Sequence, residues 1–512
     1  MSPTAGVIAV VFVSVATLAI GAFGLRVSRT TSDFYVASRS VGSVVNASAI
    51  GGEYLSAASF LGVAGLILAR GTDMLWYPVG WTAGYLVLLV LVAAPLRRSG
   101  AYTLPDFAQF RLESLTTRRA ASALVVLIGV LYLIPQLQGA GLTLRTLTGA
   151  PAWLGAALVA TIVLVIVLSG GMRSITLVQA FQYWLKMTAL LIPIAIFLVV
   201  WRHDAAPGLA GITSADWIEP LTGEHSLYST YSLILATFLG TMGLPHVVVR
   251  FYTNHDGRAA RRTTVAVLAL LSCFYVLPPL YGVLGRIYAL DLVGSGQTDS
   301  VVLELPSRIL GGGLSEVLTA LLGAGAFAAF LSTSSGLVVS VAGVVSQDLL
   351  ARHGDGVRAF RIASTLAVAA TFTLTLASSG LAVAHSVELA FAVAASTFCP
   401  LLLLGIWWPG LTARGAMVGL VVGGGLSGLA VTATLFGATA TGWLGAALAQ
   451  PAACTVPLSF ATMVGVSLAT RRHLPGSVSR IMVRLHTPEN LDVNRGDFHP
   501  ERGSASASEP AG

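Results

Sequence analysis

Charged and hydroxyl side chains lie inside three otherwise apolar stretches of this chain of 512 residues. Glu53 directly follows the adjacent glycines Gly51 and Gly52, and Lys186, the only lysine of the chain, lies in a second stretch. The hydroxyl run 332–335, Ser-Thr-Ser-Ser, lies in a third. Charges at membrane depth are costly, and they usually face a cavity or an ion path. The three stretches therefore predict a polar site enclosed by apolar segments.

The oxygen atoms expected at this site suit a small hard cation, because such cations prefer oxygen ligands. The hydroxyls of Ser332 and Thr333 are candidates. The backbone carbonyls near Gly52 and Leu55 are others, since glycine weakens a helix and an interrupted helix exposes its carbonyls to a cavity. Helix packing by small residues is the alternative explanation of the hydroxyl run.

Lys186 lies about 11 residues into its apolar run, which at ~1.5 Å per residue is roughly 17 Å deep, near the midplane of a bilayer. There it would attract an anionic substrate or exchange a proton, because a buried lysine titrates readily. A lysine that snorkels toward the lipid headgroups is the alternative. Glu53 is expected to sense a proton, to help hold a cation, or to pair with Lys186.

Three further residues are candidates for the same pocket. Tyr54 and Ser59 follow Glu53 and are candidates to line it. His246 follows a proline in another apolar run, and a histidine titrates near neutral pH. A hydrogen-bonded structural histidine is the alternative interpretation of His246.

The composition identifies the kind of protein that holds these residues. The chain is 55% hydrophobic and 10% charged, whereas soluble domains carry about 25% charged residues. This predicts an all-α polytopic membrane protein that does not bind nucleic acid, despite a net charge of +7. Cys273, Cys399 and Cys454 lack CxxC spacing, so neither disulfides nor a metal cluster are expected. The sequence contains no spacing of nucleophile and base that would indicate an enzyme.

Long apolar runs predict about 13 transmembrane helices, since roughly 20 apolar residues cross a bilayer. The expected spans are 5–25, 44–69, 75–96, 119–145, 152–169, 175–201, 227–250, 263–286, 314–349, 359–379, 384–409, 414–437 and 442–470.

The arginines predict how these spans are oriented. No basic residue precedes Arg26, so the first run lacks the basic region of a signal peptide and is expected to be a true span. With the N-terminus outside, nearly all arginines fall on inner loops or on the tail. The exceptions on outer loops are Arg70, Arg145, Arg202, Arg286 and Arg308. Because inner loops are rich in arginine, we expect a multi-pass protein of the cell membrane with an outer N-terminus and a cytoplasmic C-terminus.

Two of the predicted spans are interrupted. Gly51 and Gly52 interrupt the second span, and Gly240, Gly243 and Pro245 interrupt the seventh, five spans later. Paired interrupted helices in opposite orientation indicate a five-plus-five inverted repeat with its site at the midplane. The expected divisions are a first helix and inner loop (1–43), a transport core (44–409, with repeats at about 44–201 and 227–409), two peripheral helices (410–470) and a largely disordered cytoplasmic tail (471–512).

Several stretches carry a resemblance to a known family over most of the chain. They are Tyr54-Leu55-Ser56-Ala57-Ala58-Ser59-Phe60-Leu61-Gly62, Gln179-Ala180-Phe181-Gln182-Tyr183-Trp184-Leu185-Lys186, Gly240-Thr241-Met242-Gly243-Leu244-Pro245-His246 and Ala329-Phe330-Leu331-Ser332-Thr333. The chain resembles the sodium:solute symporter family, and within it the acetate permease and actinobacterial monocarboxylate transporter branch. The resemblance implies a leucine-transporter-like fold with broken helices. It also implies a sodium site built from the carbonyls of Gly52, Leu55 and Ala329 and the hydroxyls of Ser332 and Thr333.

One departure from the family bears on the coupling ion. Proline and sugar members have an aspartate where this chain has Gln179, and Lys186 follows two turns later. A lysine near a cation site can replace the cation in related transporters that use protons. The intact pair Ser332 and Thr333 favours sodium, and Lys186 favours a proton. Glu53, Lys186, Gln179 and His246 are therefore the coupling or gating candidates.

The resulting hypothesis is a cation-coupled symporter, with sodium favoured, that takes up small monocarboxylates such as acetate, propionate or pyruvate. The substrate is expected beside the two breaks, near Tyr54, Ser59, Gly240 and Thr241. No cofactor and no metal other than sodium are expected, so the partners are the carboxylate, the coupling cation and the bilayer. Proton-coupled uptake is one alternative, and sodium symport of proline, pantothenate or a sugar is another. A sensor role is disfavoured, because a tail of about 42 residues is short for a signalling domain.

Overall fold

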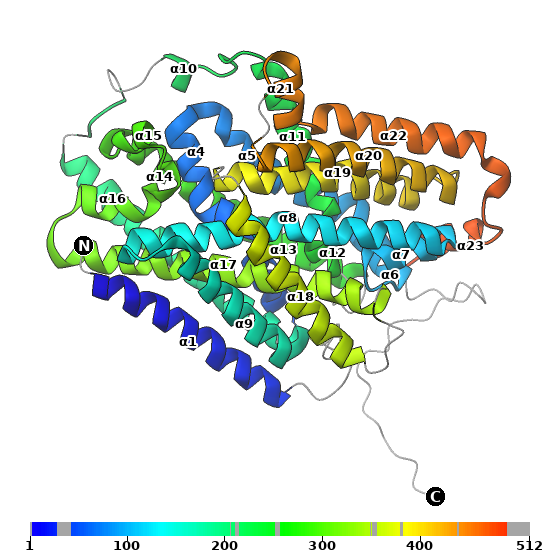
Figure 1. Ribbon diagram of the computed structural model, residues 1–512, viewed down its shortest axis with the longest axis horizontal. Helices are drawn as coiled ribbons and strands as arrows, with labels where there is room; N and C mark the ends of the chain where they lie inside the picture. Colours follow the sequence, from blue (N-terminus) through cyan, green and yellow to red (C-terminus); the bar gives the residue numbers. More distant parts are fainter. Residues whose placement is uncertain are drawn as a thin grey trace, which may run out of the picture.

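The protein is built from helices packed side by side. The computed structural model describes residues 3–27, 42–204, 206–209, 215–250, 257–348, 350, 356–378, 382–437 and 440–488, and within these ranges it contains no β-strand. Figure 1 shows most of the long helices running roughly along the long axis of the molecule. This confirms the expected all-α membrane fold.

The described residues up to 204 form eight α-helices. They are α1 (Pro3–Val27), α3 (Ser43–Tyr54), α4 (Val63–Arg70), α5 (Trp76–Val87), α6 (Ala93–Ser99), α7 (Leu104–Leu112), α8 (Leu115–Thr148) and α9 (Ala152–His203). Short π-helical turns, Ala58–Gly62 before α4 and Leu88–Val92 between α5 and α6, and a 3₁₀ turn, Gly71–Leu75, continue these helices.

The second half continues the pattern with further long helices and short connectors. They are α10 (Ala215–Ile218), α11 (Ser226–Gly243), α12 (Pro245–Val249), α13 (Gly257–Tyr275), α14 (Leu277–Tyr288), α15 (Asp291–Ser295), α16 (Val301–Ile309), α17 (Gly312–Asp348), α18 (Gly356–Ala377), α19 (Val383–Trp407), α20 (Ala413–Leu435), α21 (Gly442–Ala449), α22 (Ala452–Ala469) and α23 (Val478–His486). Thr298–Ser300 and Arg471–His473 are 3₁₀ turns.

Twelve helical segments of the described chain are long and apolar enough to cross a membrane, one fewer than predicted. The difference arises at the broken helix, because α3 has only 12 residues and α4 is counted together with the following span as Ala58–Ser99. Conversely, the 52-residue α9 would be roughly 78 Å long at ~1.5 Å per residue, more than twice the hydrocarbon thickness. Its apolar parts, Ala152–Ser169 and Ser174–His203, therefore count as two spans.

Both interrupted helices are present, but the first break lies later than predicted. Gly51 and Gly52 remain helical, and α3 ends at Tyr54, so that Leu55 and Ser56 form the break. In the second interrupted helix, α11 ends at Gly243 and α12 begins at Pro245. A proline keeps its preceding residue extended, which explains why the second break falls at Leu244.

The glycines of the two interrupted helices allow close packing instead of breaking the chain. A Cβ atom at Gly52 would lie 2.1 Å from the carbonyl oxygen of Gln179 on α9. A Cβ atom at Gly240 would lie 2.4 Å from the carbonyl oxygen of Phe391 on α19. Each interrupted helix thus packs against the fifth span of its own repeat, which is the correspondence expected of an inverted repeat.

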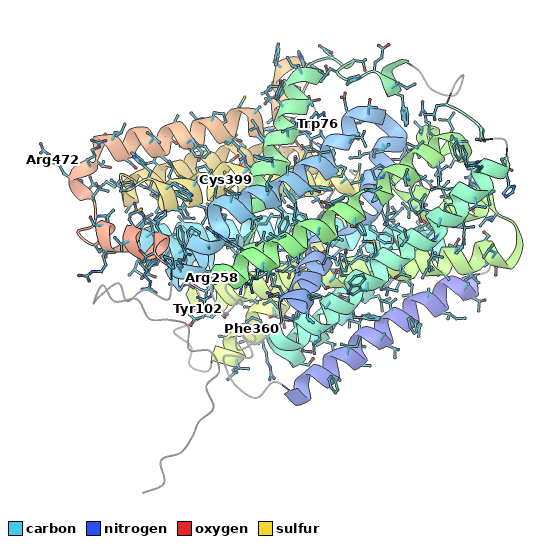
Figure 2. The ribbon with its side chains drawn as sticks, turned by 180° about the vertical axis from the view of Figure 1, so that it is seen from behind. Trp76, Tyr102, Arg258, Phe360, Cys399 and Arg472 are labelled. Atoms are coloured by element: carbon cyan, nitrogen blue, oxygen red, sulfur yellow. The ribbon has the colours of Figure 1, made fainter. Side chains whose placement is uncertain are left out.

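Outside this core, α1 packs along α9, and α20 and α22 pack on α19 (Figure 1). Figure 2 labels residues near the starts of four helices. Tyr102 (α7), Arg258 (α13) and Phe360 (α18) lie in the left half of this view, and Trp76 (α5) lies to their right. Within the segment 471–512, expected to be a largely disordered tail, α23 is helical and contacts α6. Residues 489–512 lie outside the described chain.

Candidate functional site

The predicted cation-site residues are brought together, and the ammonium of Lys186 lies among them. Lys186 is fully buried, and its Nζ donates to the carbonyl oxygen of Gly52, to that of Leu55 at 2.7 Å and to the Ser332 hydroxyl at 2.8 Å. An ammonium has three donors, so these three acceptors use all of them. The lysine faces the interior of the protein rather than the lipid.

The other two predicted ligands complete this arrangement. The Ser332 hydroxyl donates to the carbonyl of Ala329 at 3.0 Å, and the Thr333 hydroxyl donates to the carbonyl of Glu53 at 2.6 Å. The break at Leu55 and Ser56 explains why the carbonyls of Gly52 and Glu53 are available, because α3 stops before it could bond them internally, whereas Ala329 lies within the continuous helix α17. The carbonyls of Gly52 and Leu55 and the hydroxyl of Ser332 therefore hold one positive charge supplied by α9.

Glu53 pairs with an arginine that the sequence analysis placed on an inner loop. Its Oε2 lies 2.6 Å from Nε of Arg250, and both side chains are at most 3% exposed. Arg250 also donates to the Thr176 hydroxyl at 2.8 Å and to Oε1 of Gln179. Among the described residues, Glu53 makes no hydrogen bond or ion pair with Lys186. Pairing with Lys186, one of the three roles expected of Glu53, is therefore not observed.

Gln179 links the two charged centres. Its amide nitrogen donates to the carbonyl of Ser332 at 2.9 Å, while its amide oxygen accepts from Arg250. An aspartate at this position would add a second negative charge beside Glu53. The amide instead supplies both a donor and an acceptor, so it connects the Lys186 site to the Glu53–Arg250 pair without changing the charge.

The predicted substrate residues also meet, although in different roles. Tyr54 and Thr241 share a hydrogen bond of 2.9 Å across the two breaks, and Ser59 bonds the hydroxyl of Tyr275 at 2.8 Å. Gly240 packs closely against the backbone of α19 at Phe391.

Aromatic rings that the sequence analysis missed surround these residues. Phe391 lies at their centre, with ring centroids 5.7 Å from Trp81, 5.7 Å from Tyr132 and 6.3 Å from Tyr54. Tyr85 makes an edge contact with Tyr54 at 4.7 Å. The spacing of Tyr77, Trp81 and Tyr85 was a usable signal, because residues four apart lie on one face of a helix.

Several buried polar atoms of this aromatic cluster have no hydrogen-bond partner in the described chain. They are Nε1 of Trp81, the hydroxyl of Tyr85 and both ring nitrogens of His246. His246 lies 5.2 Å from Tyr132, so it belongs to the same cluster. Buried polar groups are almost always satisfied, and unsatisfied ones indicate a water or a ligand. Trp81, Tyr85 and His246 are therefore the groups of this cluster that remain available to a water or a ligand.

A second buried carboxylate lies farther along α19. Glu388 is 1% exposed and accepts from the hydroxyl of Tyr77, from the amide of Gln450 at 3.0 Å and from Nδ1 of His385 at 3.2 Å. The ring of Tyr77 lies 5.4 Å from that of Trp81. Glu388 was not among the predicted site residues, because the span 384–409 was predicted from its apolar length alone.

Two known proteins are similar in sequence to most of this chain. An uncharacterised symporter, YwcA, of Bacillus subtilis is 31% identical over 506 residues, which cover 93% of this chain and 97% of the relative. A monocarboxylic acid transporter of Corynebacterium glutamicum is 32% identical over 432 residues, which cover 77% and 78%.

Solved structures share the fold at low sequence identity. A sodium-coupled sialic acid symporter in a substrate-bound outward-open state has a TM-score of 0.67 and 13% identity, covering 91% of this chain and 98% of that one. A nucleobase-cation-symport-1 family transporter has a TM-score of 0.56 and 13% identity, covering 89% and 99%. The model of the sodium:solute symporter family matches residues 34–423. The chain therefore belongs to the sodium:solute symporter family.

Proposed function

We propose that this chain is a symporter that takes up small monocarboxylates, such as acetate, propionate or pyruvate, together with a proton. The observation that carries the choice of ion is the ammonium of Lys186, which bonds the Gly52 and Leu55 carbonyls and the Ser332 hydroxyl. A protonated lysine at this position supplies the single positive charge that a sodium ion would otherwise bring.

The protonation state of Lys186 would change how the helices are held. The ammonium joins α3, α9 and α17 through three donors, whereas a neutral amine has two donors and leaves one acceptor unbonded. An unsatisfied buried acceptor costs about 1–3 kcal/mol. Loss of the proton on the cytoplasmic side would therefore loosen α3 and favour the inward-open form.

The substrate assignment is supported by the donors around Phe391. Trp81, Tyr85 and His246 offer N–H and O–H groups to a carboxylate, and aromatic rings surround them. A relative 32% identical to this chain is named a monocarboxylic acid transporter. One carboxylate and one proton carry no net charge, so uptake would follow a pH gradient and ignore the membrane potential.

Sodium coupling is the second candidate, because the oxygens of Ser332 and Thr333 and the carbonyls around them are in place. In that case sodium would displace the lysine nitrogen. Substituting Ser332 or Thr333 by alanine would then raise the sodium concentration needed for uptake.

Uptake into proteoliposomes distinguishes the candidates. Labelled acetate, propionate, pyruvate and proline are each offered with an imposed proton gradient or an imposed sodium gradient. We expect monocarboxylate uptake driven by acid outside, without sodium. Uptake driven only by sodium would overturn proton coupling, and proline uptake without acetate uptake would overturn the substrate class.

The orientation belongs to the same proposal. The arginine distribution favours a cell-membrane protein with an outer N-terminus and a cytoplasmic C-terminus. In that orientation the connection between α4 and α5 and the segment before α11 face outward, and α7 and α23 face the cytoplasm. Protease accessibility of terminal tags in oriented vesicles tests this arrangement.

A further inference from the structure

Arg286 on α14 is a buried arginine without a carboxylate partner in the described chain. It is 9% exposed, and its Nη1 donates to the carbonyl of Leu68 at 3.3 Å. Its Nε is buried and has no hydrogen-bond partner. The guanidinium carbon lies 5.6 Å from the ring centroid of Trp217. Buried charges are ordinarily paired. In the described chain only Nη1 of Arg286 makes a hydrogen bond, so the edge formed by Nε and Nη2 is available for an external acceptor.

This guanidinium lines a cavity of about 350 Å³. The volume lies at the lower end of the range of ~300–1,000 Å³ usual for small-molecule sites. Arg70, Tyr77, Thr230 and Gln450 line the same cavity. It opens between the α4–α5 connection and the segment leading into α11, on the face proposed to be outer.

The acidic residues of the lining do not neutralise Arg286. Both carboxylate oxygens of Asp73 accept from the backbone N–H of Leu221, at 3.3 and 3.0 Å. The side chain of Glu224 is 85% exposed and lies 3.5 Å from His225. Neither forms an ion pair with Arg286 in the described chain. The cavity therefore presents an unneutralised guanidinium edge, which is the geometry that binds a carboxylate through two parallel hydrogen bonds.

The cavity shares one residue, Tyr77, with the surroundings of the central site. Tyr77 lines the cavity, donates to Glu388 and packs against Trp81, whose indole N–H is one of the unpaired central donors. Tyr77 thus connects the lining that contains Arg286 to Trp81, which belongs to the aromatic cluster. We infer that Arg286 forms an outer binding site that captures the substrate carboxylate before Tyr77 and Trp81 admit it. The inference rests on the proposed function for the identity of its ligand.

Equilibrium binding to the purified full-length protein tests this site. Labelled propionate is titrated onto the parent, Arg286→Gln, Arg286→Lys and, as a control, Arg308→Gln. Arg308 is another arginine of the same face, but it is paired with Asp291 at 2.9 Å and Glu304 at 3.1 Å. We expect two propionates per chain for the parent and the control, and one for Arg286→Gln. Arg286→Lys keeps the charge but not the two-donor edge, and its outer affinity should fall at least about tenfold.

Uptake and fluorescence give independent readouts. The KM for propionate should rise at least about tenfold in Arg286→Gln, with little change in kcat, because charge-assisted hydrogen bonds are among the strong ones. Propionate should also change the tryptophan fluorescence of the parent, and Trp217→Phe should remove that part of the change. If Arg286→Gln does not fold, the fluorescence change and its loss in Trp217→Phe still test whether propionate binds at the outer site.

The outcomes separate the two proposals. If the parent takes up propionate but Arg286→Gln keeps the parental stoichiometry and KM, the outer site is wrong and the proposed function stands. The outer site is also wrong, and the proposed function stands, if the parent takes up propionate but binds only one per chain and Trp217→Phe leaves the fluorescence change intact. If the parent neither binds nor takes up any monocarboxylate, the proposed function itself is wrong.

Discussion

The side-chain nitrogen of Lys186 lies 2.7 Å from the carbonyl oxygen of Leu55, inside the break of the first interrupted helix. The break exposes this carbonyl, and the lysine reaches it from α9, 131 residues farther along the chain. A positive charge that belongs to the protein thus lies among the oxygens that the sequence predicted for a sodium ion. In the proposed cycle this ammonium gains and loses its proton, while the side chain itself stays in place.

Removing this charge should separate binding from coupling. In Lys186→Met the oxygens of Gly52, Leu55 and Ser332 lose their donor, so a proton gradient no longer acts on α3. We expect accumulation of propionate against its gradient to fall by about tenfold or more, while exchange of labelled for unlabelled propionate continues. Thr188→Val, on the lipid-facing side of the same helix, serves as the control. Undiminished proton-driven accumulation in Lys186→Met would contradict the role of the lysine.

The two neighbouring serines of α17 should differ in effect. The Ser332 hydroxyl accepts from Lys186, whereas the Ser335 hydroxyl donates to the backbone of Ser332 and does not contact the lysine. A hydrogen bond to a charged group contributes about 1.5–3 kcal/mol. Ser332→Ala should therefore shift the pH of half-maximal uptake, and Ser335→Ala should leave it near the parental value. The pH profile of initial uptake rates measures both, and equal shifts would argue against a specific contact.

Breaking the buried Glu53–Arg250 pair should destabilise the protein more than removing both charges. Each single change, Glu53→Gln or Arg250→Gln, removes one member of the buried ion pair and leaves the opposite charge buried, which costs about 3–5 kcal/mol. The double variant leaves neither charge, and we expect it to recover much of the lost thermal midpoint in detergent. Because the pair joins α3 to the end of α12, the double variant should also open toward the cytoplasm more readily.

A matched control and an accessibility readout complete this test. Arg308→Gln breaks a surface pair at side chains that are 34% and 59% exposed, and it should change the midpoint little. Cysteine labelling at the start of α3 should increase in the double variant. If the loss of thermal midpoint in the double variant equalled the sum of the losses in the two single variants, Glu53 and Arg250 would not be energetically coupled.

Much of the fold was predictable because its signals are local. Apolar length, glycine and proline interruptions and the arginine distribution each depend on a short window of sequence, and together they predict the spans and the two interrupted helices. The position of the first break was not predictable in this way. Gly51 and Gly52 stay helical because they let α3 approach α9, and the chain opens instead at Leu55, where Lys186 bonds the carbonyl.

The site was predictable where a residue type alone is unusual, as for Lys186 and Glu53. Its partners were not, because they depend on tertiary packing across long separations. Arg250 lies 197 residues from Glu53, and nothing in the sequence distinguishes it from the other arginines predicted on inner loops. The aromatic cluster has the same origin, since Phe391 meets Trp81 and Tyr132 only when three helices are assembled.

The unpaired donors of the aromatic cluster should determine substrate affinity. Trp81→Phe and Tyr85→Phe each remove one donor while keeping a ring, so packing changes little. A lost hydrogen bond to a carboxylate is expected to cost about 1.5–3 kcal/mol, which corresponds to a rise in KM of roughly 10- to 150-fold. Trp184→Phe is the control, because Trp184 is 51% exposed on the outside of α9. Initial uptake rates over a range of propionate concentrations measure the effect, and unchanged KM values in both variants would place the substrate elsewhere.

Asp299 should make the stability of the protein depend on pH. It lies in the 3₁₀ turn Thr298–Ser300, outside the membrane spans, and its Oδ2 accepts from the N–H of Val383 at 2.9 Å. Burial raises the pKa of its carboxyl from 3.8 to about 6, and the hydrogen bond from Val383 opposes this only in part. The folded protein therefore binds this proton more tightly than the unfolded chain does.

The sign of the effect follows from this order of pKa values. Because the folded pKa is the higher one, stability is lost as the pH rises from about 4 to 6 and stays lower above 6. A difference of about two pKa units corresponds to roughly 3 kcal/mol. Asp299→Asn keeps an acceptor for Val383 but carries no charge, so it should raise the thermal midpoint at pH 7.5 and leave it nearly unchanged at pH 4. Glu224→Gln, at a side chain that is 85% exposed, is the control and should alter neither value. A lower midpoint of Asp299→Asn at pH 7.5 would mean that the charged form of Asp299 is stabilised in the folded protein.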